Sequence, residues 1–243
     1  MPEGPSIVIV KENIQQFAGK KILEVTGNAK IELERINGQK LLWIKTWGKH
    51  LLLGFEGFTV RIHFLMFGSY LIDETKSAQL RLGLTFPNGQ LNFYTTAVKF
   101  VEGNVDEQYD WAADVMSDEW NAKKARAKLK SIPEKMICDA LLEQDIFSGV
   151  GNIIKNEVLY RVRIHPESLV GKIPSRKITE IINESQIYSF EFLKWKKKNE
   201  LKKHWLAHTK KKCLRCDLPL IKKYTGTKKR RSFFCEKCQK LHE

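Results

Sequence analysis

Four cysteines near the end of the sequence have the residue type and spacing of a metal site. They form two Cys-x-x-Cys pairs with eighteen residues between them: Cys213, Cys216, Cys235 and Cys238. Each pair can place two thiolates on one ion, and two pairs complete the tetrahedral coordination of zinc. Because four thiolates leave no coordination position for a substrate, the pattern predicts structural Zn²⁺ and not a catalytic ion. Disulfides or redox-active thiols are the alternative interpretation.

The amino terminus carries a second group that can do chemistry. If Met1 is removed, Pro2 supplies a terminal secondary amine, and Glu3 follows it directly. The pKa of a terminal amine is about 7.7 to 8.0, so part of it is neutral and nucleophilic near neutral pH. Attack on an aldehyde-level carbon gives a cationic iminium, an electron sink for elimination, and the adjacent carboxyl group can transfer protons. A solvated terminus without chemistry is the alternative.

Three further residues are weaker candidates for a metal-binding or nucleophilic role. His204 and His208 are four residues apart, as on a metal-binding helix face, but no Glu accompanies them as in the HExxH pattern. We expect surface or packing roles for both. Cys138 is expected to be a small buried apolar residue and not a nucleophile.

Positive charge is concentrated in one segment. The chain holds 42 Lys and Arg against 28 Asp and Glu, a net charge of +14. Residues 194–231 hold thirteen Lys and three Arg against only Glu200 and Asp217, so this segment accounts for the net charge of the whole chain. This distribution favours an anionic polymer or surface as the partner.

The rest of the sequence argues against a membrane-spanning or a secreted protein. No stretch approaches the roughly 20 apolar residues that span a bilayer, and the first residues lack the basic segment of a signal peptide. We therefore expect no membrane partner and an intracellular location, in the cytoplasm or nucleoid. The 243 residues suffice for two modest domains, or for one core with an appendage.

The elements that must position these groups begin with a helix and strands. Apolar residues follow helical spacing over residues 6–17, and segments rich in β-forming residues follow at 40–44, 50–55, 58–64 and 80–86. The last segment alternates in polarity and ends at a Pro-Asn-Gly turn. The first half is therefore expected to form an antiparallel sandwich or barrel behind an N-terminal helix.

The pattern changes after Asp114, where the alternation disappears. Helical segments take its place, and a Gly-rich turn at 148–152 interrupts them. The expected helices lie at residues 121–129, 133–142, 153–160 and 175–198.

Four sequence blocks, each weak alone, occur in a specific order and spacing. They are MPEGP at residues 1–5, GKHLLL at 48–53, QDIFSGVGNI at 144–153 and RRSFFCEKCQ at 230–239. Taken together, the blocks resemble the formamidopyrimidine-DNA glycosylase and endonuclease VIII family, and the match covers essentially the whole chain.

The resemblance implies an α+β fold with three domains. These are an N-terminal catalytic domain of one helix and an antiparallel β-sandwich at residues 1–114, a helix-two-turn-helix DNA-binding domain at 115–205, and a zinc β-hairpin at 206–243. It also implies a monomeric base-excision-repair enzyme that binds double-stranded DNA with an oxidised base or abasic site. Such an enzyme rotates the damaged nucleotide out of the duplex, excises the base and cuts the strand.

The resemblance assigns roles to five residues by their positions in the motifs. Pro2 matches the nucleophile that forms a Schiff base with the sugar C1′, and Glu3 matches the acid that assists ring opening and base loss. Lys49 matches a lysine that contacts phosphate near the lesion and supports elimination. Asn152 and Arg230 match residues that hold phosphates, and Arg230 is linked to the second elimination. The alternatives are solubilising charges for Lys49 and Arg230, and a helix cap for Asn152.

Two apolar residues match positions that enter the duplex. Met66 and Phe100 stand where the family places side chains that wedge into the helix and fill the gap left by the extruded base. Both are equally compatible with a place in the core. Val98 stands where the purine-preferring branch has an arginine that faces the orphan base.

Other departures bear on the substrate. Ser6 replaces a glutamate that most members carry near the active site. The 47 residues between His165 and Cys213 are too few for the long lesion-capping loop of the purine branch. This short stretch, together with Gly4, favours the endonuclease VIII branch of the family. The expected substrates are then oxidised pyrimidines such as thymine glycol or dihydrouracil, with ring-opened purines as further substrates. Whether β-elimination stops or proceeds to β,δ-elimination stays open.

A competing hypothesis is a non-catalytic zinc-ribbon protein that binds nucleic acid. The basic residues 194–231 suffice for that activity, and only the amino terminus distinguishes the enzyme from the binder.

Overall fold

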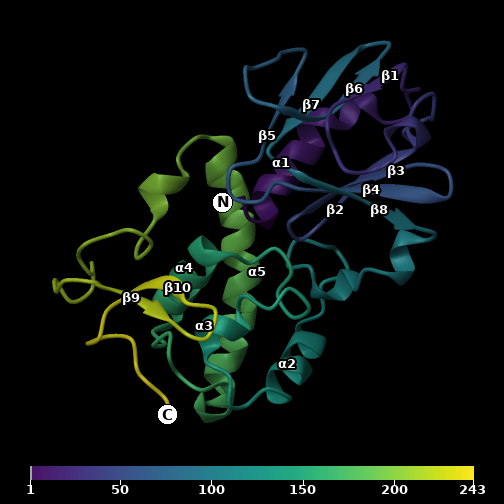
Figure 1. Cartoon of the computed structure of the whole chain (residues 1–243). Coiled ribbons are helices and arrows are strands. Elements are labelled where there is room, and N and C mark those ends of the chain that lie inside the picture. Colours follow the sequence, from purple (N-terminus) through teal and green to yellow (C-terminus); the bar gives the residue numbers. More distant parts are fainter. Residues whose placement is uncertain (1) are drawn as a thin grey trace. The chain divides into compact units, whose positions relative to one another are not determined.

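The structure, a computed structural model, describes residues 2–243. The chain divides into two compact units, one that ends at Asp110 and one that runs from Trp111 to Glu243. Figure 1 shows strands and one helix in the first unit, and helices with a two-stranded hairpin in the second. The expected division into three domains, with boundaries after residues 114 and 205, stays a prediction.

The first unit opens with helix α1 (Gly4–Ile14), whose last turn tightens into the 3-10 helix η1 (Gln15–Phe17). Pro5 lies in the first turn of α1, where its missing N–H removes no helical hydrogen bond. Ile7, Val10 and Ile14 form the buried face of α1. The helix predicted over residues 6–17 is therefore confirmed, with a 3-10 end.

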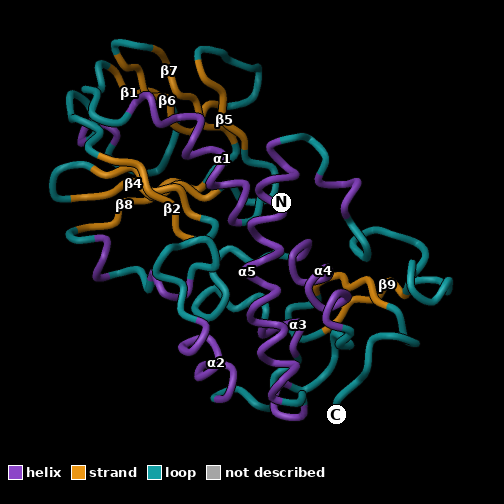
Figure 2. The backbone as a smooth tube through the Cα atoms, turned by 180° about the vertical axis from the view of Figure 1, so that it is seen from behind, coloured by secondary structure: helices purple, strands orange, loops and turns teal. Residues whose placement is uncertain are grey.

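Eight strands form two four-stranded antiparallel sheets, which Figure 2 shows as separate layers. Their orders are β1-β6-β7-β5 and β2-β3-β4-β8. The core between them includes Leu51, Leu53, Leu82 and Leu91. The predicted antiparallel sandwich is thus confirmed. The strands are β1 (Glu24–Thr26), β2 (Trp43–Trp47), β3 (His50–Gly54), β4 (Phe58–His63), β5 (Ser69–Ile72), β6 (Leu80–Phe86), β7 (Gly89–Tyr94) and β8 (Ala97–Glu102).

The second unit is built around helices α4 and α5, which pack on each other. Ile154 and Val158 of α4 and Ile181 of α5 are fully buried in its core. The helices are α2 (Ala122–Lys130), α3 (Ile137–Ala140), α4 (Asn152–Val162) and α5 (Ser175–Lys197). The helical domain predicted after residue 114 is confirmed.

One predicted helix is shorter than expected. Residues 133–142 yield only the single turn α3, because the chain beyond it forms tight i to i−3 hydrogen bonds. Leu142 N donates to Asp139 O at 2.9 Å, and Glu143 N donates to Ala140 O at 3.2 Å. These bonds turn the chain toward the Gly-rich segment before α4.

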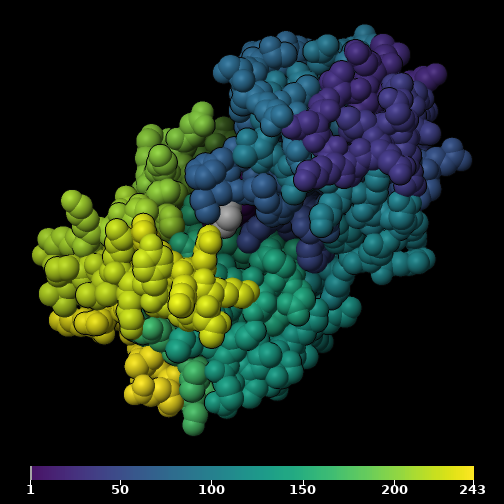
Figure 3. Space-filling view, viewed as in Figure 1, coloured from purple at the N-terminus to yellow at the C-terminus, as the bar shows by residue number. Residues whose placement is uncertain are grey.

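The C-terminal residues form the antiparallel hairpin of β9 (Ile221–Thr225) and β10 (Arg230–Phe234). They contribute a continuous part of the surface of the second unit, yellow in Figure 3. Among residues 2–243, no helix has the length and apolar character needed to cross a bilayer. Short 3-10 helices complete the chain: η2 (Leu33–Arg35), η3 (Val105–Glu107), η4 (Trp111–Ala113), η5 (Val170–Lys172) and η6 (Leu201–His204).

Candidate nucleic-acid interface and metal centre

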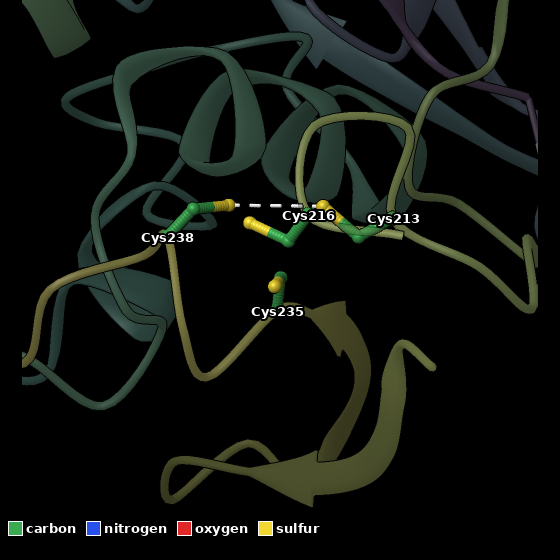
Figure 4. Close-up of side chains that lie close together, drawn as sticks. All are labelled: Cys213, Cys216, Cys235 and Cys238. Atoms are coloured by element: carbon green, nitrogen blue, oxygen red, sulfur yellow. Dashed lines mark hydrogen bonds between the residues drawn. The ribbon is translucent and has the colours of Figure 1, made fainter. Parts of the chain in front are cut away.

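The four predicted metal ligands come together at the base of the hairpin (Figure 4). Their Sγ atoms all lie within 4.8 Å of one another. One pair precedes β9 and the other follows β10, so hairpin pairing brings the two pairs to the same place. Asp217 adopts a left-handed conformation, φ 59°, and its N–H donates to Cys213 O at 2.9 Å, which closes the first turn.

The cluster has the dimensions and chemistry of a tetrathiolate zinc site. The Sγ atoms of Cys213 and Cys238 are 3.8 Å apart. Two thiolates on a tetrahedral zinc with Zn–S bonds of about 2.3 Å are separated by about 3.8 Å. The residues present therefore fit a metal ion, and the cluster can hold one.

Neighbouring groups hold the cysteines and tune them. Burial opposes ionisation of the Cys213 thiol, but hydrogen bonds from Tyr160 and from the backbone of Arg215 and Cys216 outweigh it and lower the pKa of Cys213 to about 6. Tyr160 Oη lies 3.4 Å from Cys213 Sγ. The Gln239 side chain accepts from Cys235 N and donates to Ile164 O, each at 2.9 Å, so it ties the second pair to the helical part of this unit.

Arg230 begins strand β10 and is half-buried, opposite Thr225 in the hairpin. Asn152 is the first residue of α4, and Gly151 occupies the cap position, so Asn152 is not the helix cap that the sequence allowed. Asn152 Nδ2 donates to Arg231 O at 2.9 Å. The structure therefore joins the Gly-Asn-Ile turn to the residue directly after Arg230.

The start of α4 has the electrostatics of an anion site. Its first turn contains no acidic residue, and a helix N-terminus carries a positive partial charge. Lys155 is fully buried one turn into the helix, and its Nζ lies 2.8 Å from Ser232 Oγ and 3.3 Å from Arg231 O. Sequence analysis missed Lys155, because nothing in its local pattern distinguishes a buried lysine from a solvated one.

Pro2 and Glu3 precede α1 directly. Glu3 occupies the N-cap position with extended backbone, and its O accepts from Ser6 N at 2.8 Å. Its side chain is 1% exposed, while Pro2 is half-buried. A buried carboxyl group therefore stands next to the proline at the positive end of a helix dipole. Met1 lies outside the described residues.

Lys49 lies in the tight turn between β2 and β3, where Gly48 has φ 52°. The next residue, His50, is held neutral: burial, then the nearby charges of Arg61, His63 and Lys49, lower its pKa to about 4. A neutral imidazole and an ammonium group thus follow each other at this turn.

The two predicted wedge residues have different environments. Met66 lies in the turn after β4 and is 51% exposed, and its neighbour Phe67 is 78% exposed. Phe100 lies in β8 and packs edge-on against Phe58, with ring centroids 5.3 Å apart, beneath the guanidinium of Arg35. The sequence analysis missed Phe67, although the run of apolar residues before Gly68 was a usable signal.

His204 and His208, for which packing or surface roles were expected, pack against aromatic rings and do not join the cysteine cluster. His204 stacks on Trp195 at 4.2 Å. His208 lies against Trp205 and Phe233, and burial together with the charge of Lys155 lowers its pKa to about 4.

The predicted site residues are divided between the two units. The first unit holds Pro2, Glu3, Lys49, Met66 and Phe100. The second holds Asn152, Arg230 and the four cysteines. In this unit the start of α4, with Asn152, contacts the β9–β10 hairpin that carries Arg230 and the cysteine cluster.

Two family models match the sequence. The formamidopyrimidine-DNA glycosylase N-terminal domain matches residues 1–101, and the formamidopyrimidine-DNA glycosylase H2TH domain matches residues 111–188. H2TH denotes the helix-two-turn-helix arrangement.

Curated relatives come from both branches of this family. Endonuclease 8-like 3 of Xenopus laevis is 28% identical over 244 residues, which cover 94% of this chain and 40% of that protein. The chain thus spans about 40% of the length of this relative. Formamidopyrimidine-DNA glycosylase of Streptococcus mutans is 28% identical over 278 residues, which cover 99% of this chain and 100% of that protein.

Solved structures show the same fold. The crystal structure of Lactococcus lactis formamidopyrimidine-DNA glycosylase, bound to DNA that contains an AP site, has a TM-score of 0.86 at 22% identity and covers 98% of this chain. It is itself covered over 99% of its length. Since the two family models together match most of the sequence, the chain belongs to the formamidopyrimidine-DNA glycosylase and endonuclease VIII family.

Proposed function

We propose that this protein is a bifunctional DNA glycosylase and AP lyase of base excision repair. The observation that carries the proposal is the pair at the amino terminus, where Pro2 precedes the buried carboxyl group of Glu3 at the start of α1. Other features of the chain also serve a nucleic-acid binder, whereas an amine beside a buried acid is what a Schiff-base step with proton transfer requires.

Removal of Met1 exposes the Pro2 amine, which attacks the sugar C1′. Glu3 supplies the proton for opening of the sugar ring and loss of the base. The C1′–N bond to the base breaks as the Pro2 nitrogen bonds to C1′. The C1′–O4′ bond then breaks, O4′ takes up a proton, and the C1′–N bond to Pro2 becomes a cationic iminium. The iminium accepts the electron pair released when a proton leaves C2′, and the 3′-phosphate departs. Hydrolysis returns the free amine.

The second unit supplies the grip on the DNA backbone. Asn152 and the start of α4 bind phosphate beside the lesion, and Arg230 binds the phosphates of the extruded nucleotide and supports a second elimination. The four cysteines would hold a structural zinc ion that would stabilise the hairpin, and no chemical step passes through the metal. Lys49 binds phosphate from the first unit.

The proposed partner is double-stranded DNA that carries an oxidised base or an abasic site, bound by a monomer in the nucleoid. Met66 and Phe100 are the proposed void-filling residues, and Phe67 joins Met66 in the same exposed turn. Oxidised pyrimidines are the preferred substrates, because the 47 residues between His165 and Cys213 are too few for the lesion-capping loop of the purine branch. Val98 offers no hydrogen bond to an orphan base, so selectivity for the opposite base should be weak.

Borohydride trapping on an abasic duplex tests the proposal. Protein with a free Pro2 amine should form a covalent adduct that maps to Pro2 by mass spectrometry. The matched control is the same chain with an extra N-terminal tag, which should bind the duplex yet form no adduct. A chain that binds the duplex with a free terminus and gives no adduct would be a non-catalytic binder, and the enzymatic proposal would fail.

A further inference from the structure

Asp139 lies in α3 and is only 2% exposed, yet its carboxylate contacts the turn between β9 and β10. One oxygen accepts from Thr227 N at 2.6 Å and from Thr227 Oγ1 at 3.0 Å. The other accepts from Lys228 N at 3.3 Å. A single buried carboxylate thus receives three hydrogen bonds from two consecutive residues of the hairpin turn.

The turn is shaped to sit on this carboxylate. Gly226 has φ +69°, and a Cβ built there would lie 2.4 Å from each carboxylate oxygen. No other residue type allows the backbone to approach so closely. Lys228 adds a second attachment, since its Nζ lies 3.0 Å from Glu143 Oε2 and 3.2 Å from Leu142 O. The hairpin turn is therefore fastened to residues 139–143.

Arg230 stands between this attachment and a second one. It follows Lys228 by two residues, and Arg231 O accepts from Asn152 Nδ2 on its other side. The four cysteines lie at the opposite end of the hairpin, next to Phe234. The base of the hairpin thus lies at the cysteine cluster, and Asp139 supports the end that carries Arg230.

A guanidinium that binds phosphate must be held to within about 0.5 Å to keep its hydrogen bonds. Arg230 is the first residue of β10, the second strand of a two-stranded ribbon, and such a ribbon is marginally stable alone. Three hydrogen bonds to the Asp139 side chain fix the backbone of this ribbon at its turn.

We propose that Asp139 is a positioning residue that fixes the β9–β10 turn and thereby holds Arg230 in place to bind DNA phosphate. The inference rests on the proposed function, because it assigns to Asp139 an effect that acts through Arg230. Asp139 itself touches no substrate.

A double-mutant cycle tests this coupling. Asp139→Asn keeps the shape of the side chain but faces an N–H donor with another donor, and Asp139→Ala removes all three acceptor contacts. Each is made alone and together with Arg230→Gln. The readouts are kcat/KM for cleavage of an abasic duplex and Kd for a duplex with an uncleavable tetrahydrofuran abasic analogue. Zinc content and Tm are measured for every variant. The matched control is Asp145→Asn, the same chemical change at an exposed residue of the same segment.

We expect Asp139→Asn to weaken Kd about tenfold when Arg230 is present and less than about twofold when Arg230 is already Gln. Asp145→Asn should leave Kd unchanged in both backgrounds. Should Asp139→Ala lose zinc or fold poorly, Asp139→Asn alone decides the cycle. Equal losses in both backgrounds, or no loss in either, would overturn the coupling between Asp139 and Arg230. Neither result would contradict the proposed cleavage activity. An Arg230→Gln variant with wild-type affinity would instead remove Arg230 from the proposed function and the inference with it.

Discussion

The Sγ atoms of Cys213 and Cys238 lie 3.8 Å apart, although the two residues are 25 positions apart in the chain. This separation is the one that two thiolates have on a single tetrahedral zinc ion, and it arises because the pairing of β9 with β10 brings the two cysteine pairs together.

Zinc content gives the first prediction. The purified protein should carry one zinc per chain by atomic emission, and Cys216→Ser should lose it, because three thiolates bind far less tightly than four. We expect Tm to fall by at least about 5 °C, since metal binding contributes directly to folding. Cys138→Ala is the matched control, because Cys138 is buried outside the cluster, and it should retain zinc. Full zinc content in Cys216→Ser would contradict the predicted ligand set.

Glu3→Gln should separate the two chemical steps. Base loss needs a proton from the carboxyl group, whereas an abasic substrate has already lost its base. We expect a loss of at least about 100-fold on a duplex with an oxidised pyrimidine, the scale of general acid catalysis, and a much smaller loss on an abasic duplex. Glu12→Gln, the same chemical change at an exposed residue of α1, serves as control. Equal losses on both substrates would show that Glu3 has no special part in base departure.

Met66→Ala and Phe100→Ala should distinguish the two predicted wedge residues. Met66 is half exposed, so its truncation should change the free energy of unfolding by less than about 0.5 kcal/mol. The Met66→Ala variant should nevertheless cleave a lesion in duplex DNA more slowly, relative to its cleavage of the same lesion in a single strand. A single strand has no gap for the side chain to fill. Phe100→Ala should cost about 2 kcal/mol, less than a fully buried Phe, because it removes the contacts with Phe58 and Arg35. Urea unfolding and paired cleavage assays measure both effects, and unchanged duplex cleavage by Met66→Ala would exclude a wedge role for it.

Stability should fall as the pH drops below neutrality. Burial, together with nearby cationic groups, lowers the pKa of His50 and of His208 to about 4, from an ordinary value of 6.5. An unfolded imidazole takes up its proton near pH 6.5, so between about 4 and 6.5 the unfolded state binds more protons than the folded one. The stabilisation is therefore complete above about pH 6.5 and is lost as the pH falls toward 4.

Thermal melts from pH 7.5 to 4.5 measure this dependence. We expect Tm to decrease on the order of 5 °C or more over that range. His50→Gln, which does not titrate, should reduce the slope, although it also lowers stability at all pH values. A slope identical to that of the unmodified chain would show that His50 does not contribute.

Local patterns in the sequence were enough to predict the cluster of four cysteines, the N-terminal helix, several of the antiparallel strands and the long helix α5, but not β1, β5 or β8. These features depend on residues close together in the chain, such as the two cysteines of one Cys-x-x-Cys turn or the 3.6-residue period of Ile7, Val10 and Ile14. The motifs near Pro2, Lys49 and Asn152 could be recognised in the sequence because each occupies one short segment.

Tertiary structure alone decided which charged and apolar residues are buried. Asp139 and Thr227 are 88 residues apart, and nothing near Asp139 in the sequence announces the N–H groups that make its burial possible. Met66 and Phe100 are both apolar residues, yet Met66 is half exposed whereas Phe100 packs against Phe58. The energy of a side chain depends on what surrounds it, and those surroundings come from segments that are distant in the chain. A sequence pattern therefore reveals how a segment folds, while the contacts between segments determine what its side chains do.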